Sequence, residues 1–419
     1  MLKIVNGPLL QYSDMDGFGP GLKSALWYNT YWILFSFMAL LFSSMLWNRG
    51  VKSGLLMRMK TAKKERPKYH FGILLACTGL WLTVAAVIYY NTQLRNPYIS
   101  DANQKKLAAA YEKKYAPIKN VALHKVTNIK YYIDFFPAER NVNFKATLEL
   151  TNTAANPIDS LHFHTLDGWN SQLEVSNASL VNRDEQYNYF GYKLHAPLQP
   201  GEKMEVNIKS AFITQGFSND RGNTNIINNG SFFNNRELLP IMGYAWNKEL
   251  KDHNQRTKHG LPAKRNMPKL AKTSGKSHMT NLLSDMHADF IAIETVISTS
   301  EDQVAIAPGT LIKKWEENDR NYYRYKIDIP SLNFHSFMSA AYEVRKRHWN
   351  GIDLEVYYDK KHGVNVGTML DAMQASLDYY TKNFGPYYHK QARIIEFPRY
   401  RGFAMAFAGT MPYSEALVF

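Results

Sequence analysis

The sequence predicts a membrane-anchored protein of mixed fold class, with two transmembrane helices, then an all-β antiparallel sandwich or saddle domain, then the start of an α/β domain. Two long uncharged stretches near the amino terminus predict the helices. Short alternating segments separated by Asn, Asp, Gly and Pro predict the sandwich. A helical period that returns after residue 348, followed by strand-like segments, predicts the α/β part.

Residues 24–47 and 71–90 are the candidate membrane spans. Both runs are uncharged, and about 20 apolar residues suffice to cross the hydrocarbon core. Two tryptophans and two tyrosines crowd the start of the first run, as aromatic residues do at a membrane interface. A buried core helix of a soluble domain is the alternative for either run, but two such runs around a basic segment favour a membrane.

The distribution of charge predicts the direction of the spans. The chain has 50 Lys and Arg against 36 Asp and Glu, a net charge of +14. Residues 49–70 hold eight of the basic residues and one acidic residue, hence +7, and basic loops are retained in the cytoplasm. We therefore expect a cytoplasmic loop at 48–70, with residues 1–23 and 91–419 outside, in a multi-pass protein of the inner or plasma membrane. Residues 1–23 resemble an extracytoplasmic lead-in loop more than a signal peptide, so further spans are expected before them.

Residues 91–120 are predicted to form a stalk helix and a linker. Ser100 and Asp101 can cap a helix that Pro117 ends. The stalk would hold the next domain away from the bilayer, and a solvated linker helix is the alternative.

From residue 121 to residue 347 the period is two, which is typical of an antiparallel sandwich. The segments expected to be strands are YYIDFFP, NFKATLELTN, SLHFHTL, LEVSNASL, YFGYKLHAPL, KMEVNIKSAFIT, ADFIAIETVIST, NYYRYKIDIPS and FMSAAYEVRK. A Pro-Gly pair before KMEVNIKSAF makes the clearest turn.

A long polar insertion, residues 216–285, interrupts the sandwich. It contains a second basic run, residues 248–276, which has nine Lys and Arg residues and two acidic residues, again a net charge of +7. This run could bind anionic lipid headgroups, and a solvated loop is the alternative. Nucleic acid is not an expected partner, because no aromatic residues are interleaved with the basic ones.

The last region, residues 348–419, starts with a strand and changes to a helical period. Met369, Met373, Leu377 and Tyr380 recur at steps of four, four and three residues, which places them on one stripe of a helix. A Gly-Pro pair ends this helix. The segments ARIIEFPRY and FAMAFAGTMPYSEALVF then predict strands joined by a tight turn.

The single cysteine, Cys77, lies within the second span. An intrachain disulfide is therefore excluded, and so is a cysteine nucleophile. An exported domain with no cysteine suits a bacterial envelope. The sequence has no Gly-x-x-x-x-Gly-Lys-Ser/Thr and no Gly-x-Ser-x-Gly, so ATP would have to be bound by a separate subunit and a serine-hydrolase elbow is excluded.

The order of these segments resembles the aminopeptidase-N-like gluzincin zinc metallopeptidases. The resemblance covers about residues 120–419 and is carried by SLHFHTL, LQPGEKMEVNIKSAF, YRYKIDIPSLNFHSFMSAAYEV, LDYYTKNFGPYY and the closing small-residue loop. With two spans before it, NGSFFNNRELLPIMGYAWNKEL resembles the bacterial branch that is fused to ABC-type transporter permease spans. The resemblance implies a β-sandwich peptidase domain at 121–347, the truncated start of a thermolysin-like catalytic domain at 348–419, a peptide substrate and an ABC-type ATPase subunit as a partner.

In that family a Gly-Ala-Met-Glu-Asn loop lines the substrate cleft. The resemblance transfers this role to the candidate substrate-binding residues Ala404, Met405, Ala406, Phe407, Gly409, Tyr413 and Glu415. The family's Glu, which pairs with the free α-amine of the substrate, is replaced by Ala406, and the adjoining Asn is replaced by Phe407. Loss of such a charge-assisted hydrogen bond weakens binding of the substrate's amino terminus by about 1.5–3 kcal/mol. Whether the intact relative cleaves peptides from their amino terminus is therefore left open.

The same family binds zinc through a His-Glu-x-x-His helix, and none of the 13 histidines begins that motif. Zinc is expected for the intact relative, whereas these 419 residues are expected to contain no metal ligand and no catalytic residue. His162 and His164 lie two residues apart on one strand face. Without a carboxylate they make a weak zinc pair, and a half-buried strand face is the alternative.

Three functions are therefore weighed. The first is the amino-terminal part of a membrane-bound, aminopeptidase-like zinc metallopeptidase, fused to or partnered with an ABC-type permease and catalytically incomplete, because the fragment ends before the zinc helix. The second is a membrane-anchored β-sandwich module that holds peptides or regulates a transporter without catalysis, which Ala406 favours. The third is a transporter subunit, which requires further spans before Met1.

Overall fold

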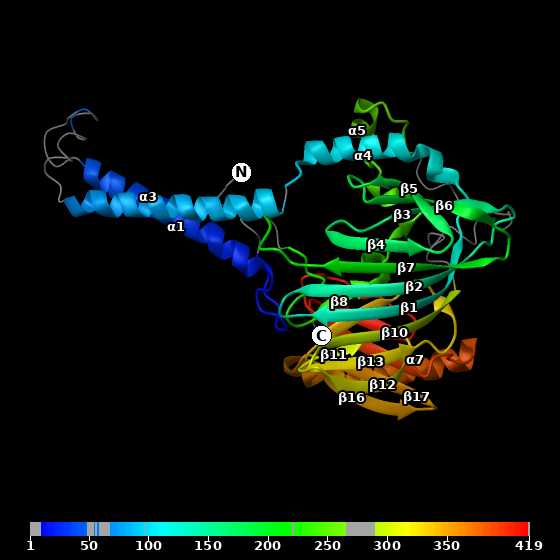
Figure 1. Ribbon diagram of the computed structural model, residues 1–419. Helices are drawn as coiled ribbons and strands as arrows, with labels where there is room; N and C mark the ends of the chain where they lie inside the picture. The colour runs from blue at the N-terminus through cyan, green and yellow to red at the C-terminus, as the bar shows by residue number, and fades with distance from the viewer. Residues whose placement is uncertain are drawn as a thin grey trace. The chain divides into compact units, whose positions relative to one another are not determined.

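The structure, a computed structural model, describes residues 10–47, 54, 57, 68–96, 98–219, 222–264 and 290–417. It divides into two compact units, each built from separate stretches of chain (Figure 1). The first, the helical unit, is made of Met1–Tyr12, Phe18–Tyr98 and Gln215–Thr224. The second, the β-rich unit, is made of Ser13–Gly17, Ile99–Thr214 and Asn225–Phe419. Two predicted segments lie partly outside the described residues. They are the cytoplasmic loop, residues 48–70, and the second basic run, residues 248–276, which is described only as far as residue 264.

Two apolar helices form the helical unit. They are α1, Gly21–Leu46, and α3, Lys68–Tyr89, which continues into the π-helical turn η2, Tyr90–Arg95. Both are long and apolar enough to cross a membrane, and they include nearly all of the predicted spans. They pack side by side as an antiparallel pair, with the rings of Tyr31 and Trp81 5.1 Å apart (Figure 1).

The largest sheet of the β-rich unit has eight strands, in the order β12-β13-β10-β1-β2-β7-β4, with β14 paired to β10. Burial alternates along β2, as the period of two predicts. The strands are β1 Lys125–Phe136, β2 Asn141–Thr151, β4 Trp169–Val175, β7 Lys203–Phe212, β10 Phe290–Ser300, β12 Thr310–Glu317, β13 Arg320–Lys326 and β14 Ser331–Leu332.

Two smaller sheets pack with the large one around a shared core. Their orders are β5-β6-β3-β9 and β11-β15-β8. Their strands are β3 Ile158–His164, β5 Ala178–Asp184, β6 Tyr189–Leu198, β8 Ser231–Asn234, β9 Ile241–Met242, β11 Val304–Ile306 and β15 Ser336–Ala340. Phe144 of β2, Phe163 of β3 and Phe337 of β15 belong to one hydrophobic cluster. The unit is therefore layered, as expected, but it is built from several sheets.

One strand pairing differs from the predicted antiparallel pattern. β1 and β10 run parallel, with Ile133 opposite Ile297. An antiparallel pair can be closed by a short turn, whereas a parallel pair needs a long crossover. Here the crossover is the whole stretch of chain between β1 and β10, which includes β2 to β9 and the polar insertion. Side-chain alternation is the same for both directions, so the sequence pattern could not distinguish them.

From Asn225 to residue 264, the described part of the predicted polar insertion, residues 216–285, belongs to the β-rich unit, whereas its first residues belong to the helical unit. It supplies β8 and β9, the turns η4 Asn235–Glu237 and η5 Trp246–Lys248, and the short helix α5 His253–Lys258. Phe233 of β8 is fully buried. Within the second basic run, Leu250 and Arg256 are buried, so the described part of that run is not simply a solvated loop.

The helix after the spans is α4, Asp101–Tyr115, followed by the turn η3, Ala116–Asn120. Ser100 caps it as expected, accepting a hydrogen bond from the backbone N–H of Asn103 at 3.3 Å. Tyr111 and Tyr115 are buried in a cluster with tyrosines of the β5-β6-β3-β9 side. The guanidinium of Arg256 binds Glu112 through two 2.7 Å hydrogen bonds. α4 is thus packed against the β-rich unit over its second half.

A four-stranded sheet of order β16-β17-β18-β19 ends the described chain. Its strands are β16 Glu343–Trp349, β17 Ile352–Tyr358, β18 Gln391–Phe397 and β19 Thr410–Ser414, and the last three are mutually parallel. The turn η7, Lys360–Asn365, and the helix α7, Val366–Phe384, connect β17 to β18. α7 buries Leu370 and Met373 against this sheet and is capped by Gly385, as the Gly-Pro pair predicts.

Candidate functional site

The closing stretch of the described chain forms a hairpin at the edge of the four-stranded sheet. β19 pairs with β18 on one side. On its other side, residues 403–407 run antiparallel to it through bridges from Ala404 to Tyr413 and from Phe407 to Thr410. Gly409 makes the turn with a φ of 64°, a left-handed conformation that favours glycine.

The hydrogen bonds of the hairpin define which main-chain groups face outward. The amides of Met405 and Phe407 donate to the carbonyl oxygens of Pro412 and Thr410, at 3.1 and 2.8 Å. Because successive residues of a strand point in opposite directions, the main-chain N–H and C=O of Ala406 point away from β19. The hairpin therefore presents an outer edge of main-chain groups.

An open groove of about 1090 Å³ lies between this hairpin and α7. One wall is the predicted helical stripe of Met369, Met373, Leu377 and Tyr380. Six of the seven predicted substrate-binding residues line the other wall: Ala404, Met405, Ala406, Phe407, Gly409 and Tyr413.

The groove is apolar in character. No aspartate or glutamate occurs among the described residues that line it. Burial lowers the pKa of His389, with Asp328 opposing, so this imidazole is neutral at pH 7. Burial also raises the pKa of Tyr413. The groove suits apolar side chains, and at Ala406 it offers no charge to an ammonium group.

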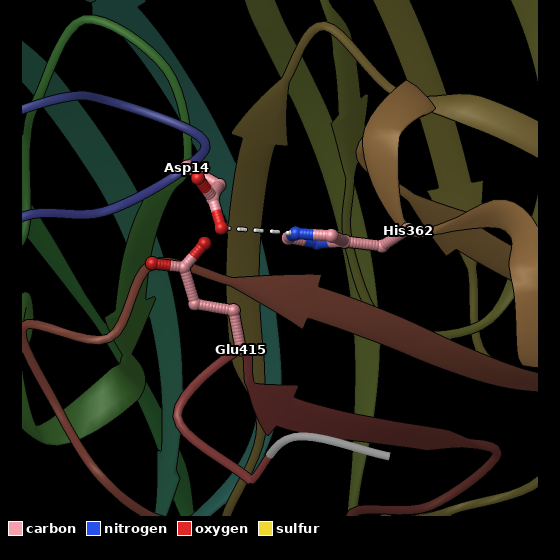
Figure 2. A group of neighbouring side chains, drawn as sticks. All are labelled: Asp14, His362 and Glu415. Carbon is pink, nitrogen blue, oxygen red and sulfur yellow. Dashed lines mark hydrogen bonds and ion pairs between the residues drawn. The ribbon is translucent and has the colours of Figure 1, made fainter.

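The seventh predicted residue, Glu415, lies elsewhere. Its carboxylate points toward Asp14 and His362 (Figure 2), and one ligand atom from each residue lies within 4.8 Å of the others. Nε2 of His362 is 3.4 Å from Oδ2 of Asp14. Nδ1 of His362 is 2.6 Å from Oε1 of Glu396, on β18. The three side chains thus come from the segment before α1, from η7 and from the turn after β19.

Several carboxylates make this cluster electronegative. Burial raises the pKa of Asp16 to about 6, and Glu415 adds to the rise. The pKa of Glu396 is raised by the same two causes, although a hydrogen bond from the Asp359 backbone opposes them. Burial opposes charge on His362, but Glu396 and Asp14 outweigh it and raise the pKa of this imidazole. The surroundings therefore favour positive charge.

Sequence reasoning missed Asp14 and His362. They are 348 residues apart, and neither lies in a recognisable metal-binding spacing. Glu415 was predicted through the resemblance, but as a substrate-binding residue and not as a metal ligand. No local signal in the sequence could have joined these three residues.

The residues present do not fit the zinc site that the resemblance implies. The chain contains no His-Glu-x-x-His. Nδ1 of His164 contacts the carbonyl oxygen of Gly243 at 3.1 Å, and Nδ1 of His162 contacts the Tyr189 hydroxyl at 2.7 Å. These two imidazoles are thus engaged with protein groups, and no zinc chemistry follows from them.

No protein-family profile matches the chain, and no curated protein matches it. Solved structures of M1 zinc metallopeptidases are similar to it. One from Deinococcus radiodurans has 14% sequence identity and a TM-score of 0.45, over 71% of this chain and 61% of that chain. A mutant of the peptidase from that organism, bound to a Tyr-Ser-Ala substrate, has 14% identity and a TM-score of 0.42, over 69% of this chain and 60% of its own.

A mutant two-domain M1 zinc metallopeptidase bound to L-arginine has 15% identity and a TM-score of 0.44. The match covers 70% of this chain and 60% of that one. This chain therefore spans about three-fifths of the length of these structures.

Proposed function

We propose that this chain is the membrane-anchored, peptide-binding part of a metallopeptidase of the aminopeptidase-N-like kind. The observation that carries the proposal is the hairpin at residues 403–414, whose sequence resembles the cleft loop of that family and whose outer edge borders an apolar groove. Cleavage is not assigned to these 419 residues, because they lack the zinc-binding motif.

The binding mode proposed is addition of a peptide strand. An extended peptide can pair with the free edge of a sheet through main-chain hydrogen bonds, while pockets receive alternate side chains. The outward main-chain groups of Ala406 supply the pairing edge. The apolar wall that contains Met369 and Met373 would receive the side chains. The replacement of the family's Glu by Ala406 favours a peptide held without recognition of its amino terminus.

Fluorescence anisotropy of a labelled apolar tripeptide, with the full chain in detergent, tests the proposal. Ala406→Pro removes the outward N–H but leaves the hairpin donors Met405 and Phe407 in place. Ala406→Val keeps that N–H and serves as the matched control. We expect binding by the wild type and the valine variant and loss of binding by the proline variant, with unchanged circular dichroism. Equal binding by both variants, or none by the wild type, would contradict the proposed edge.

Two properties support a membrane anchor. α1 and α3 leave large apolar side chains exposed, such as Leu40 at 68% and Leu75 at 75%, which lipid can cover. The β-rich unit contains both Ser13–Gly17, before α1, and the chain from Ile99, after η2. Two crossings return a chain to the same side, so this arrangement supports one side of the membrane for both stretches. The basic loop between the helices favours the cytoplasm for itself and hence the extracytoplasmic side for the β-rich unit.

Labelling of single cysteines with a membrane-impermeant maleimide tests this topology. In a Cys77→Ser background, Lys106→Cys on exposed α4 should react in intact spheroplasts. Lys60→Cys, in the basic loop, should react only after the membrane is permeabilised. The reverse pattern would place the β-rich unit in the cytosol and refute the topology.

The proposed function also includes association of the chain with an ABC-type permease and its ATPase subunit. It is supported by the resemblance of residues 229–250 and by the helical pair. Cross-linking in native membranes should join the chain to an ATP-binding subunit. If the chain cross-links only to itself, the association is excluded, and the part of the second function that remains is a membrane-anchored module that holds peptides without catalysis.

A further inference from the structure

The cluster of Asp14, His362 and Glu415 has the donor set of a metal site. It offers two carboxylates and one imidazole nitrogen within 4.8 Å of one another. The 3.4 Å between Nε2 of His362 and Oδ2 of Asp14 is close to the roughly 3.3 Å that separates neighbouring ligands of a tetrahedral cation with bonds near 2.0–2.1 Å. Figure 2 shows the three side chains converging on one point from three elements.

A second observation is the state of the Glu415 carboxylate. Glu415 is 5% exposed, and its Oε2 makes no hydrogen bond to any described residue. Its Oε1 accepts a hydrogen bond from the backbone N–H of Arg399 at 3.1 Å. A buried carboxylate oxygen without a partner is costly, and the side chain that carries it is aimed at Asp14 and His362. A cation between them would give this oxygen a partner.

The third observation is the support of His362. A metal-binding histidine usually donates its second ring N–H to a carboxylate, which fixes the tautomer and orients the ring. Here Nδ1 of His362 lies 2.6 Å from Oε1 of Glu396, which is itself held by the backbone N–H of Asp359 at 2.8 Å. This arrangement directs Nε2 toward Asp14 and Glu415.

We propose that Asp14, His362 and Glu415 bind a divalent transition-metal cation, with Zn²⁺ and Mn²⁺ as the chemically suited ions. An imidazole ligand favours such ions over Mg²⁺ and Ca²⁺, and two carboxylates neutralise the charge. Asp14 is 43% exposed in its side chain, which gives the ion a route from solvent and room for water as a further ligand. The inference differs from the sequence-based expectation of no metal ligand, because the three residues meet only in the folded chain.

The proposed ion has a structural role. It joins the segment before α1 to the loop after β17 and to the end of β19. That segment is already held by hydrogen bonds, since Lys361 donates to the carbonyl oxygen of Asp14 at 2.6 Å and the Asn229 side-chain amide donates to that of Met15 at 2.9 Å. The ion would add a link that chelators can remove.

Equilibrium dialysis of the full chain in detergent against Zn²⁺, Mn²⁺ and Ca²⁺ separately, with metal analysis, tests the site. The matched control is the exposed pair of His348 and Asp353, which has a 2.7 Å imidazole–carboxylate contact but no third ligand among the residues that the structure describes. We expect one equivalent of Zn²⁺ or Mn²⁺ in the wild type and in His348→Gln. His362→Gln and Glu415→Gln should each weaken binding at least about tenfold.

Glu415→Gln retains an oxygen for the Arg399 N–H but removes the 3.6 Å ion pair between Glu415 and the Arg399 guanidinium, so circular dichroism must first show that this variant is folded. A shift of the unfolding midpoint by added metal supplies a second measurement, and it should occur in the wild type and be lost in both ligand variants. Absence of Zn²⁺ and Mn²⁺ binding, tighter binding of Ca²⁺, or binding that survives both ligand variants would each overturn the assignment.

Discussion

Acidification should destabilise the β-rich unit through His164. This side chain is completely buried, and its Nδ1 lies 3.1 Å from the carbonyl oxygen of Gly243, so Nδ1 carries the proton. Its Nε2 has no hydrogen-bond partner among the described residues, and the rings of Tyr111, Tyr115 and Tyr189 surround it. A proton on Nε2 would therefore be a buried charge. Burial, with Lys248 acting in the same direction, lowers the pKa of His164 from 6.5 to about 4.

The direction of this pH effect on stability follows from proton linkage. Between these two pKa values the unfolded chain binds a proton that the folded chain excludes, so stability falls as the pH drops from 6.5 toward 4. From pH 7 to pH 5 the expected loss from this residue alone is about 2 kcal/mol.

Urea denaturation at the two pH values, followed by tyrosine and tryptophan fluorescence in detergent, measures this loss. His164→Asn keeps a donor for Gly243 but cannot titrate, so it should lose that part of the pH dependence. His253→Asn, an exposed histidine on α5, is the control and should behave as the wild type. If His164→Asn retained the full pH dependence, the buried neutral imidazole would be refuted as its source.

Two further variants test the packing described above. Gly409→Ala should lower the free energy of unfolding by about 1–2 kcal/mol, because its φ is +64° and a Cβ would lie 3.1 Å from a backbone oxygen of β18. Gly402→Ala, where a Cβ would meet open space, is the control and should change this free energy little. Equal effects of the two variants in urea denaturation would contradict the strained turn. Arg256→Ala should lower the free energy of unfolding by about 3–5 kcal/mol, because it leaves the carboxylate of Glu112 buried without its partner. If calorimetry shows a decrease below about 1 kcal/mol, water replaces the arginine and the prediction is wrong.

Local features of the sequence predicted the elements well. The two long apolar helices follow from composition alone, because two runs of about 20 uncharged residues are long enough to cross a membrane. The cap at Ser100 and the end of α7 at Gly385 follow from the chemistry of single residues. The predicted helical stripe with Met369 forms a wall of the groove, because residues three and four apart share a helix face.

Features that depend on distant partners were not predictable in this way. The parallel pairing of β1 and β10 and the burial of Phe233 within a polar-looking segment depend on long crossovers, which leave no periodic signal. The hairpin at residues 403–414 was predicted through the family resemblance, in which its glycine and tyrosine keep a short spacing. Asp14 and His362 were missed because a cluster assembled from three remote segments has no spacing to recognise.

The segment at residues 13–17 has a consequence for how the protein is made. Its partners include Asn229, Lys361 and Tyr400, so this stretch is synthesised well before any of the segments that it contacts. Contacts so remote in the chain close slowly, because the intervening loop must be ordered first. Until residues 361–400 have been synthesised, the segment at residues 13–17 lacks these partners, and we expect it to be open to proteolysis in that interval.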